Sequence, residues 1–223
     1  MNWIKKNWNW VVVTLIGIIP LIPVFSMIQL DFSSSADSWI SMGTITVPGH
    51  RPGEAVRQVS GAHIAVKETG EWAIRWMVVI LSLTPIAILT GIKSRLFVRQ
   101  AAGIITFVYA ALHFIFFCID RGWFETFKEF GYVMGLIAAL IMAVLAISSN
   151  RKSMRLLAKT WKKMHRTAYL AALLAITHVM LLKHGTWLPY LIILALGFVV
   201  RTSFVKSRLS KLRTRNAVTF AHP

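Results

Sequence analysis

Long apolar segments alternate with short polar ones along this chain. Six of the apolar segments are close to the ~20 residues that an α-helix needs to cross ~30 Å of hydrocarbon. They cover residues 10–30, 72–92, 100–119, 131–149, 166–183 and 187–203. This pattern predicts an all-α, multi-pass integral membrane protein that folds as a six-helix bundle.

The first apolar segment allows two interpretations. Lys5 and Lys6 precede an apolar run, and residues 34–36 are small, as in a signal peptide. The run is long for a signal-peptide core, however. We therefore predict a retained helix that is kinked by Pro20 and Pro23.

The polar segments divide the chain into four predicted parts. These are an N-terminal transmembrane helix (1–31), an external loop (32–70), a transmembrane core (71–203) and a basic cytoplasmic tail (204–223). The loop is rich in Ser, Pro and Gly, and we expect an ordered flap or a short surface segment rather than a domain. Basic and apolar residues interleave at helical spacing over residues 150–165, which predicts an amphipathic helix on the inner leaflet. No internal repeat is evident.

The charges are distributed unevenly between the two sides of the predicted bundle. With the N-terminus in the cytoplasm, 18 of the 25 Lys and Arg residues fall in the inner segments. All 8 acidic residues fall outside. The positive-inside rule therefore places both termini in the cytoplasm and makes the net charge of +17 a topology signal rather than a nucleic-acid footprint. The basic residues also favour contact with the headgroups of membrane lipid.

The composition excludes several kinds of metal and nucleotide site. Hydrophobic residues make up 56% of the chain and charged residues 15%, and the mean hydropathy is +0.62. The single cysteine, Cys118, excludes an internal disulfide and a multi-cysteine metal or iron–sulfur site. The sequence also lacks a Gly-rich phosphate loop and a dinucleotide fingerprint.

Two histidines lie well inside predicted spans at matching heights. His113 follows Gln100 by 13 residues, and His178 follows His165 by 13 residues. At 1.5 Å per residue, both lie about 20 Å above the inner end of their helices, near the outer leaflet. Two neutral imidazoles at one depth between two helices are the axial ligands that a b-type haem iron requires.

Each of these histidines lies above a strip of small residues. At offsets of three, seven and ten residues before His113 lie Ala110, Thr106 and Gly103, and at the same offsets before His178 lie Ala175, Ala171 and Ala168. Such strips leave room for a flat macrocycle between the helices. They are also typical of helices that pack directly on one another, and a buried histidine can simply hydrogen-bond across helices. Two histidines at the same depth, each above a strip of small residues, favour haem binding over direct helix packing.

Two further residues are candidates for the site. His165 starts the fifth predicted helix at the inner surface, and its position is about 140° from the face of His178 on an ideal helix. It is either a ligand of a second, inner haem or a headgroup-facing histidine. Arg75 lies one turn inside the outer boundary, where it could pair with Glu71 or contact haem propionates or a quinone headgroup.

Three stretches of the chain resemble the ferric-reductase-like transmembrane domain family, and the similarity covers about residues 64–200. The stretches are Glu68–Arg75 running on to Leu83–Pro85, Arg99–Gly103 running on to Tyr109–Phe114, and Trp161–Arg166 followed by Tyr169–Ala172 and His178. The resemblance implies a helical bundle in a bacterial inner membrane that binds haem b and passes electrons across it. It also implies that His113, His165 and His178 match haem-ligand positions.

The resemblance further implies a cytoplasmic electron donor, either a flavin reductase or a quinol, and a periplasmic acceptor protein. One haem is expected, with a second haem, FMN or a quinone as further candidates. The flavin and nucleotide domains of larger family members are missing, so we expect a separate donor. The external loop 31–63 is longer than the family pattern, which puts the usual periplasmic partner in doubt.

We therefore predict an electron-transfer subunit of an oxidoreductase system rather than a complete enzyme. The alternative is a structural or accessory subunit of a larger photosynthetic or respiratory membrane complex, with or without haem. A transporter is less consistent with the sequence, because few polar side chains line the predicted spans.

Overall fold

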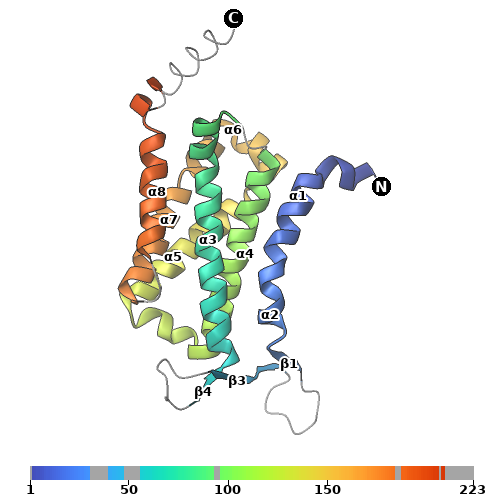
Figure 1. Ribbon diagram of the computed structural model, residues 1–223, viewed down its shortest axis with the longest axis vertical. Helices are drawn as coiled ribbons and strands as arrows, with labels where there is room; N and C mark the ends of the chain where they lie inside the picture. Colours follow the sequence, from blue (N-terminus) through green and yellow to red (C-terminus); the bar gives the residue numbers. More distant parts are fainter. Residues whose placement is uncertain are drawn as a thin grey trace, which may run out of the picture.

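The computed structural model describes residues 2–30, 40–47, 56–92, 96–183, 187–205 and 207–208, and these residues are mostly helical. Figure 1 shows a bundle of long helices with short strands at one end. The helices are α1 (Asn2–Ile18), α2 (Ile22–Phe25), α3 (Gly61–Thr90), α4 (Leu96–Arg121), α5 (Phe130–Ile147), α6 (Arg151–His165), α7 (Ala168–Leu181) and α8 (Leu188–Val200), with 3-10 turns η1 (Ile19–Leu21) and η2 (Trp123–Phe127). Most of the predicted tail 204–223 lies outside the described residues.

Three of the helices are long and apolar enough to cross a membrane, namely α3, α4 and α5. The first and last predicted spans correspond to shorter apolar helices, Trp10–Phe25 and Leu188–Val200. The fifth predicted span corresponds to α7, which has 14 residues. By length and composition, the structure thus supports three of the six predicted spans. A break occurs in the first segment where Pro20 was expected to kink it, because η1 separates α1 from α2.

Short strands form in and next to the described parts of the predicted loop 32–70. Two antiparallel strand pairs form there, β1 (Ile28–Leu30) with β2 (Ile40–Met42) and β3 (Thr44–Val47) with β4 (Arg57–Ser60). The prediction of an all-α chain is therefore wrong for this segment. Three or four residues per strand carry too little alternation for the pattern to be visible in the sequence.

Helix α3 begins at Gly61, so residues 61–70 are helical rather than part of the predicted loop. The Ser60 side chain caps the helix by accepting a hydrogen bond from the Ala62 N–H. Ala62, Ala65 and Thr69 are buried along one face, which explains why these turns pack as part of the bundle. The extension matters because it contains Val66 and Gly70, which lie next to the His113 side chain of α4.

The helices of the bundle pack chiefly in two pairs, α3 with α4 and α5 with α7, and α8 covers α3. Figure 1 places α6 at the end of the bundle opposite the strands, where α1 begins and α8 ends. No described side chain of α6 is fully buried, and its apolar and basic residues lie on different faces, as the sequence predicted for an interfacial helix. We call this end of the bundle the α6 end and the other the strand end.

Candidate functional site

The imidazoles of His113 on α4 and His178 on α7 face each other inside the bundle. Their ring centres are 6.1 Å apart, and the ring planes meet at 84°. Two imidazoles that share one metal, each with its nitrogen about 2 Å from the metal, have ring centres about 6 Å apart. The two histidines that the sequence singled out are therefore at a separation that fits a shared iron. Within the described residues, no group of three or more His, Cys, Asp and Glu side chains could hold a metal ion.

Each imidazole is oriented by a backbone carbonyl of the neighbouring helix. His113 Nδ1 lies 2.8 Å from the Val66 carbonyl oxygen on α3, and His178 Nδ1 lies 2.8 Å from the Gly131 carbonyl oxygen on α5. A carbonyl oxygen only accepts, so Nδ1 carries the proton in both rings and Nε2 carries the lone pair. This tautomer is the one expected of a metal-binding histidine whose other nitrogen donates to a carbonyl.

A glycine makes room for each ring. A Cβ atom on Gly70 would lie 2.8 Å from His113 Nδ1, and a Cβ atom on Gly135 would lie 2.7 Å from His178 Nδ1. Neither glycine was among the candidates from the sequence. They lie on the helices that neighbour the histidine-bearing ones, so the periodicity of the histidine helices gave no sign of them.

The two histidines lie in the wall of a cavity of about 530 Å³, the size range of small-molecule and cofactor sites. Ala110 and Ala175, from the predicted small-residue strips, line this cavity as expected. The lower members of the strips instead line a second cavity nearer the α6 end, namely Thr106, Gly103, Ala171 and Ala168. Thus the strips divide between two spaces within the bundle.

Arg75 forms the ion pair with Glu71 that one of its two interpretations predicted. Its guanidinium donates to the Glu71 carboxylate at 2.7 Å and lies 4.9 Å from the centre of the Trp72 ring. Arg75 also lines the larger cavity. The side chain is 40% exposed, so its charge is partly screened by solvent.

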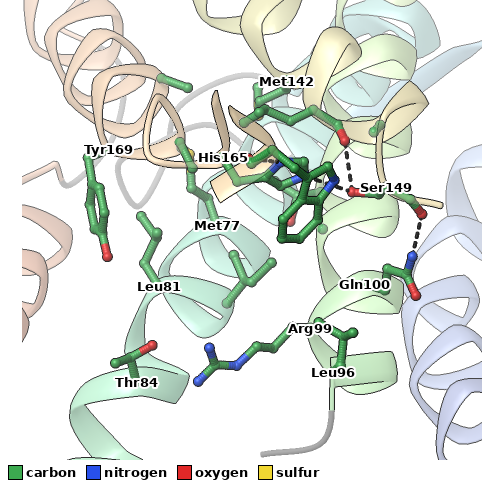
Figure 2. Close-up of a pocket in the computed structure, with 18 of the residues that line it drawn as sticks. Met77, Leu81, Thr84, Leu96, Arg99, Gln100, Met142, Ser149, His165 and Tyr169 are labelled. Carbon is green, nitrogen blue, oxygen red and sulfur yellow. Dashed lines mark hydrogen bonds between the residues drawn. The ribbon is translucent and has the colours of Figure 1, made fainter. Parts of the chain in front are cut away.

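The second cavity, of about 280 Å³, has several hydrogen-bonding side chains in its wall. Figure 2 shows its hydrogen bonds around Ser149: Gln100 Nε2 donates to the Ser149 carbonyl at 2.5 Å, and the Ser149 hydroxyl lies 3.2 Å from His165 Nε2. Arg99 extends across this cavity from α4 toward Thr84 on α3. We refer to this space as the inner cavity and to the space between His113 and His178 as the outer cavity.

His165 lies in the inner cavity with a neighbour at each ring nitrogen. Nδ1 lies 3.1 Å from the Trp161 carbonyl oxygen, Nε2 faces Ser149, and the ring stacks on the Trp161 indole at 3.8 Å. Burial lowers the pKa of His165, which favours its neutral form. The structure therefore separates His165 from the pair formed by His113 and His178 and places it beside Gln100.

The outer cavity is built from two copies of one arrangement. In each copy, 47 residues separate the carbonyl from the histidine that donates to it. Residues 65 positions apart are identical at five places on the cavity wall: Gly70 and Gly135, Ala73 and Ala138, Met77 and Met142, Ala110 and Ala175, and His113 and His178. The helix pairs α3–α4 and α5–α7 thus form an internal repeat, which the sequence did not reveal because few residues at this offset are identical. By the same offset, Gln100 corresponds to His165.

Comparison with known proteins identifies a family and several relatives that this chain resembles. The family described as "Ferric reductase like transmembrane component" matches residues 69–176. Proteins named "Protein-methionine-sulfoxide reductase heme-binding subunit MsrQ" from Bordetella pertussis, Bordetella parapertussis and Bordetella bronchiseptica are each 33% identical over 126 residues. Each alignment covers 53% of this chain and 61% of the relative. No solved structure matches.

Proposed function

The chain is a membrane protein with a ferric reductase like transmembrane domain, and on that premise we propose that it is a haem b subunit that relays electrons across the membrane. The observation that carries the proposal is the pair of facing imidazoles. His113 and His178 are 6.1 Å apart between ring centres, and a carbonyl orients each ring. The resemblance to proteins named as haem-binding subunits supports the same cofactor.

The residues of the outer cavity fit a haem. Nε2 of His113 and of His178 would bind the iron, which changes oxidation state by one electron when the haem is bound. Ala110 and Ala175 leave space for a flat ring system, and Arg75 supplies a cation at the wall for acidic substituents. Two histidine ligands would complete the axial coordination of the iron, so these residues favour electron transfer over oxygen chemistry.

We propose that the inner cavity receives the electrons. It lies nearer the α6 end, where basic residues gather, and the positive-inside rule assigns that end to the cytoplasm. Met77 and Met142 line both cavities, so a donor in the inner cavity would be a short distance from the haem. Gly103 and Ala171 would flank this donor, which we infer to be the ring of a quinol or of a flavin such as FMN.

Among the described residues, His165 is the one histidine in the wall of the inner cavity, and it would be the ligand of a second haem there. Its repeat partner is Gln100, however, and both side chains make hydrogen bonds to Ser149. We therefore favour one haem per chain, with His165 as part of the wall of the donor cavity. The acceptor would be a protein of the methionine sulfoxide reductase type, as the name of the relatives indicates, and we propose that it lies in the periplasm.

Electron transfer by purified protein in vesicles tests the proposal. Ferricyanide is trapped in the lumen of the vesicles, dithionite is added outside, and the loss of ferricyanide absorbance is followed. The wild-type protein should accelerate the loss, and His113→Ala and His178→Ala should each reduce the rate to that of empty vesicles. Thr177→Val is the matched control, because Thr177 adjoins His178 and its hydroxyl donates to the Leu173 carbonyl of its own helix. A wild-type rate equal to that of empty vesicles would contradict the relay and favour an accessory role.

A further inference from the structure

The repeat places a glycine opposite each candidate axial ligand in the same way. Gly70 follows Val66 by one helical turn on α3, and Gly135 follows Gly131 by one turn on α5. In both copies, the carbonyl accepts from the histidine Nδ1, and the glycine lies against the edge of the ring that carries that nitrogen. The carbonyl and the glycine together form a notch for the imidazole, defined by Val66 and Gly70 in one copy and by Gly131 and Gly135 in the other.

We propose that Gly70 and Gly135 are positioning residues that hold the two axial imidazoles of the haem in nearly perpendicular planes. This inference rests on the proposed function, because it assumes that His113 and His178 share an iron. What it adds to the proposed function is the angle between the two imidazole planes and the role of Gly70 and Gly135 in setting that angle.

The contact distances explain why glycine is required. A Cβ atom at Gly70 would lie 2.8 Å from Nδ1 and 2.9 Å from Cε1 of His113, and a Cβ atom at Gly135 would lie 2.7 Å and 2.9 Å from the same atoms of His178. Carbon and nitrogen atoms repel strongly at these distances. An alanine would therefore push the ring away from the carbonyl, and the ring could not keep both its hydrogen bond and its plane.

The observed angle between the ring planes is 84°. The plane of an axial imidazole selects which iron d orbital it destabilises, so perpendicular planes make two of these orbitals nearly equal in energy. A low-spin ferric haem with such ligands gives a strongly anisotropic EPR signal at low field, whereas parallel planes give an ordinary rhombic spectrum. Ring orientation is therefore measurable without any assay of electron transfer.

The test is EPR of the purified ferric holoprotein, combined with haem transfer to an excess of apomyoglobin. The wild type should give the strongly anisotropic signal. Gly70→Ala and Gly135→Ala should each move that signal and weaken haem binding by about tenfold or more, the usual effect of losing support for a metal-ligating histidine. The matched control is Gly17→Ala, where a Cβ atom would lie 2.6 Å from Ile105 Cδ1, a clash between α1 and α4 that involves neither imidazole. It should leave the signal and the haem affinity unchanged.

The outcomes separate this inference from the proposed function. A wild-type protein that binds haem but gives a rhombic spectrum overturns the perpendicular orientation alone, and this result does not depend on whether any variant folds. Alanine variants with the wild-type signal and haem affinity overturn the role of the glycines. A wild-type protein that binds no haem overturns the proposed function itself.

Discussion

Arg201 donates a hydrogen bond to a carbonyl of α3 that has no helical donor, because the residue four positions later is a proline. Pro85 lies inside α3 and has no N–H, so the Leu81 carbonyl lacks its usual donor four residues later. Arg201, at the end of α8, donates its Nη2 to that carbonyl at 2.6 Å. We expect Arg201→Met to destabilise the protein, because methionine keeps apolar volume near α3 but leaves the Leu81 oxygen without this donor.

The size of the effect follows from the setting of this bond. Hydrogen bonds between membrane helices average ~0.6 kcal/mol and reach ~1.7 kcal/mol, and a charged donor belongs at the upper end of that range. Leu81 is 9% exposed, so water does little to replace the lost donor. We therefore expect Arg201→Met to lower the free energy of unfolding by about 1.5 kcal/mol.

A double-mutant cycle isolates this bond from other effects of the arginine. Pro85→Ala supplies a backbone N–H that competes for the Leu81 carbonyl, so Arg201→Met in that background should cost less than about 0.5 kcal/mol. The assay is unfolding in mixed micelles titrated with SDS, followed by tryptophan fluorescence. Equal costs of Arg201→Met in the two backgrounds would show that the arginine acts through something other than the carbonyl that Pro85 leaves unpaired.

Three further predictions concern single side chains. Arg75→Gln should change the free energy of unfolding by no more than about 0.5 kcal/mol, because the ion pair of Arg75 is exposed. The same substitution should lower the haem midpoint potential, because it removes a cation from the cavity wall. An unchanged potential in a redox titration would show that Arg75 does not influence the haem electrostatically. Tyr109→Phe removes a buried hydrogen bond of 2.7 Å to the Gly17 carbonyl and should cost about 1 kcal/mol in the same SDS titration, with the haem spectrum unchanged; a stability equal to the wild type would contradict this. Asn150→Ala removes the N-cap bond to the Ser153 N–H, 2.8 Å long, and should increase amide hydrogen exchange in the first turn of α6; unaltered exchange there would argue against the cap.

The sequence could predict those features that depend on one segment at a time. The length and apolar content of α3, α4 and α5 identify them as membrane-spanning candidates, and the interleaved basic and apolar residues over 150–165 predict the amphipathic helix α6. The matching heights of His113 and His178 rest on the regular rise of two helices, and the structure confirms that they meet.

The features that the sequence could not predict depend on contacts between segments. The carbonyls that orient the imidazoles belong to every residue type, so Val66 and Gly131 have no recognisable signature. Gly70 was the last residue of the predicted external loop, and its closeness to His113 depends on how α3 and α4 pack. The bond from Arg201 to Leu81 joins residues 120 positions apart, beyond any local pattern.

The surroundings of His165 also depend on contacts between segments. The sequence allowed His165 to be either a ligand of a second, inner haem or a headgroup-facing histidine, and the structure places it in the inner cavity beside Ser149 and Gln100. The spacing along a helix gives the height of a side chain. Whether that side chain can bind a cofactor together with a second residue depends on which residue faces it from the neighbouring helix. Here the residue at the corresponding position of the repeat is an amide rather than an imidazole.

The central claim is that His113 and His178 bind the two sides of one haem iron. The most direct measurement is a reduced-minus-oxidised absorption spectrum of the purified protein, with the haem quantified as its pyridine haemochrome. The claim predicts one b-type haem per chain, lost in both His113→Ala and His178→Ala and retained in His165→Ala. A wild-type protein without haem, or a full haem content in either of the first two variants, would contradict it.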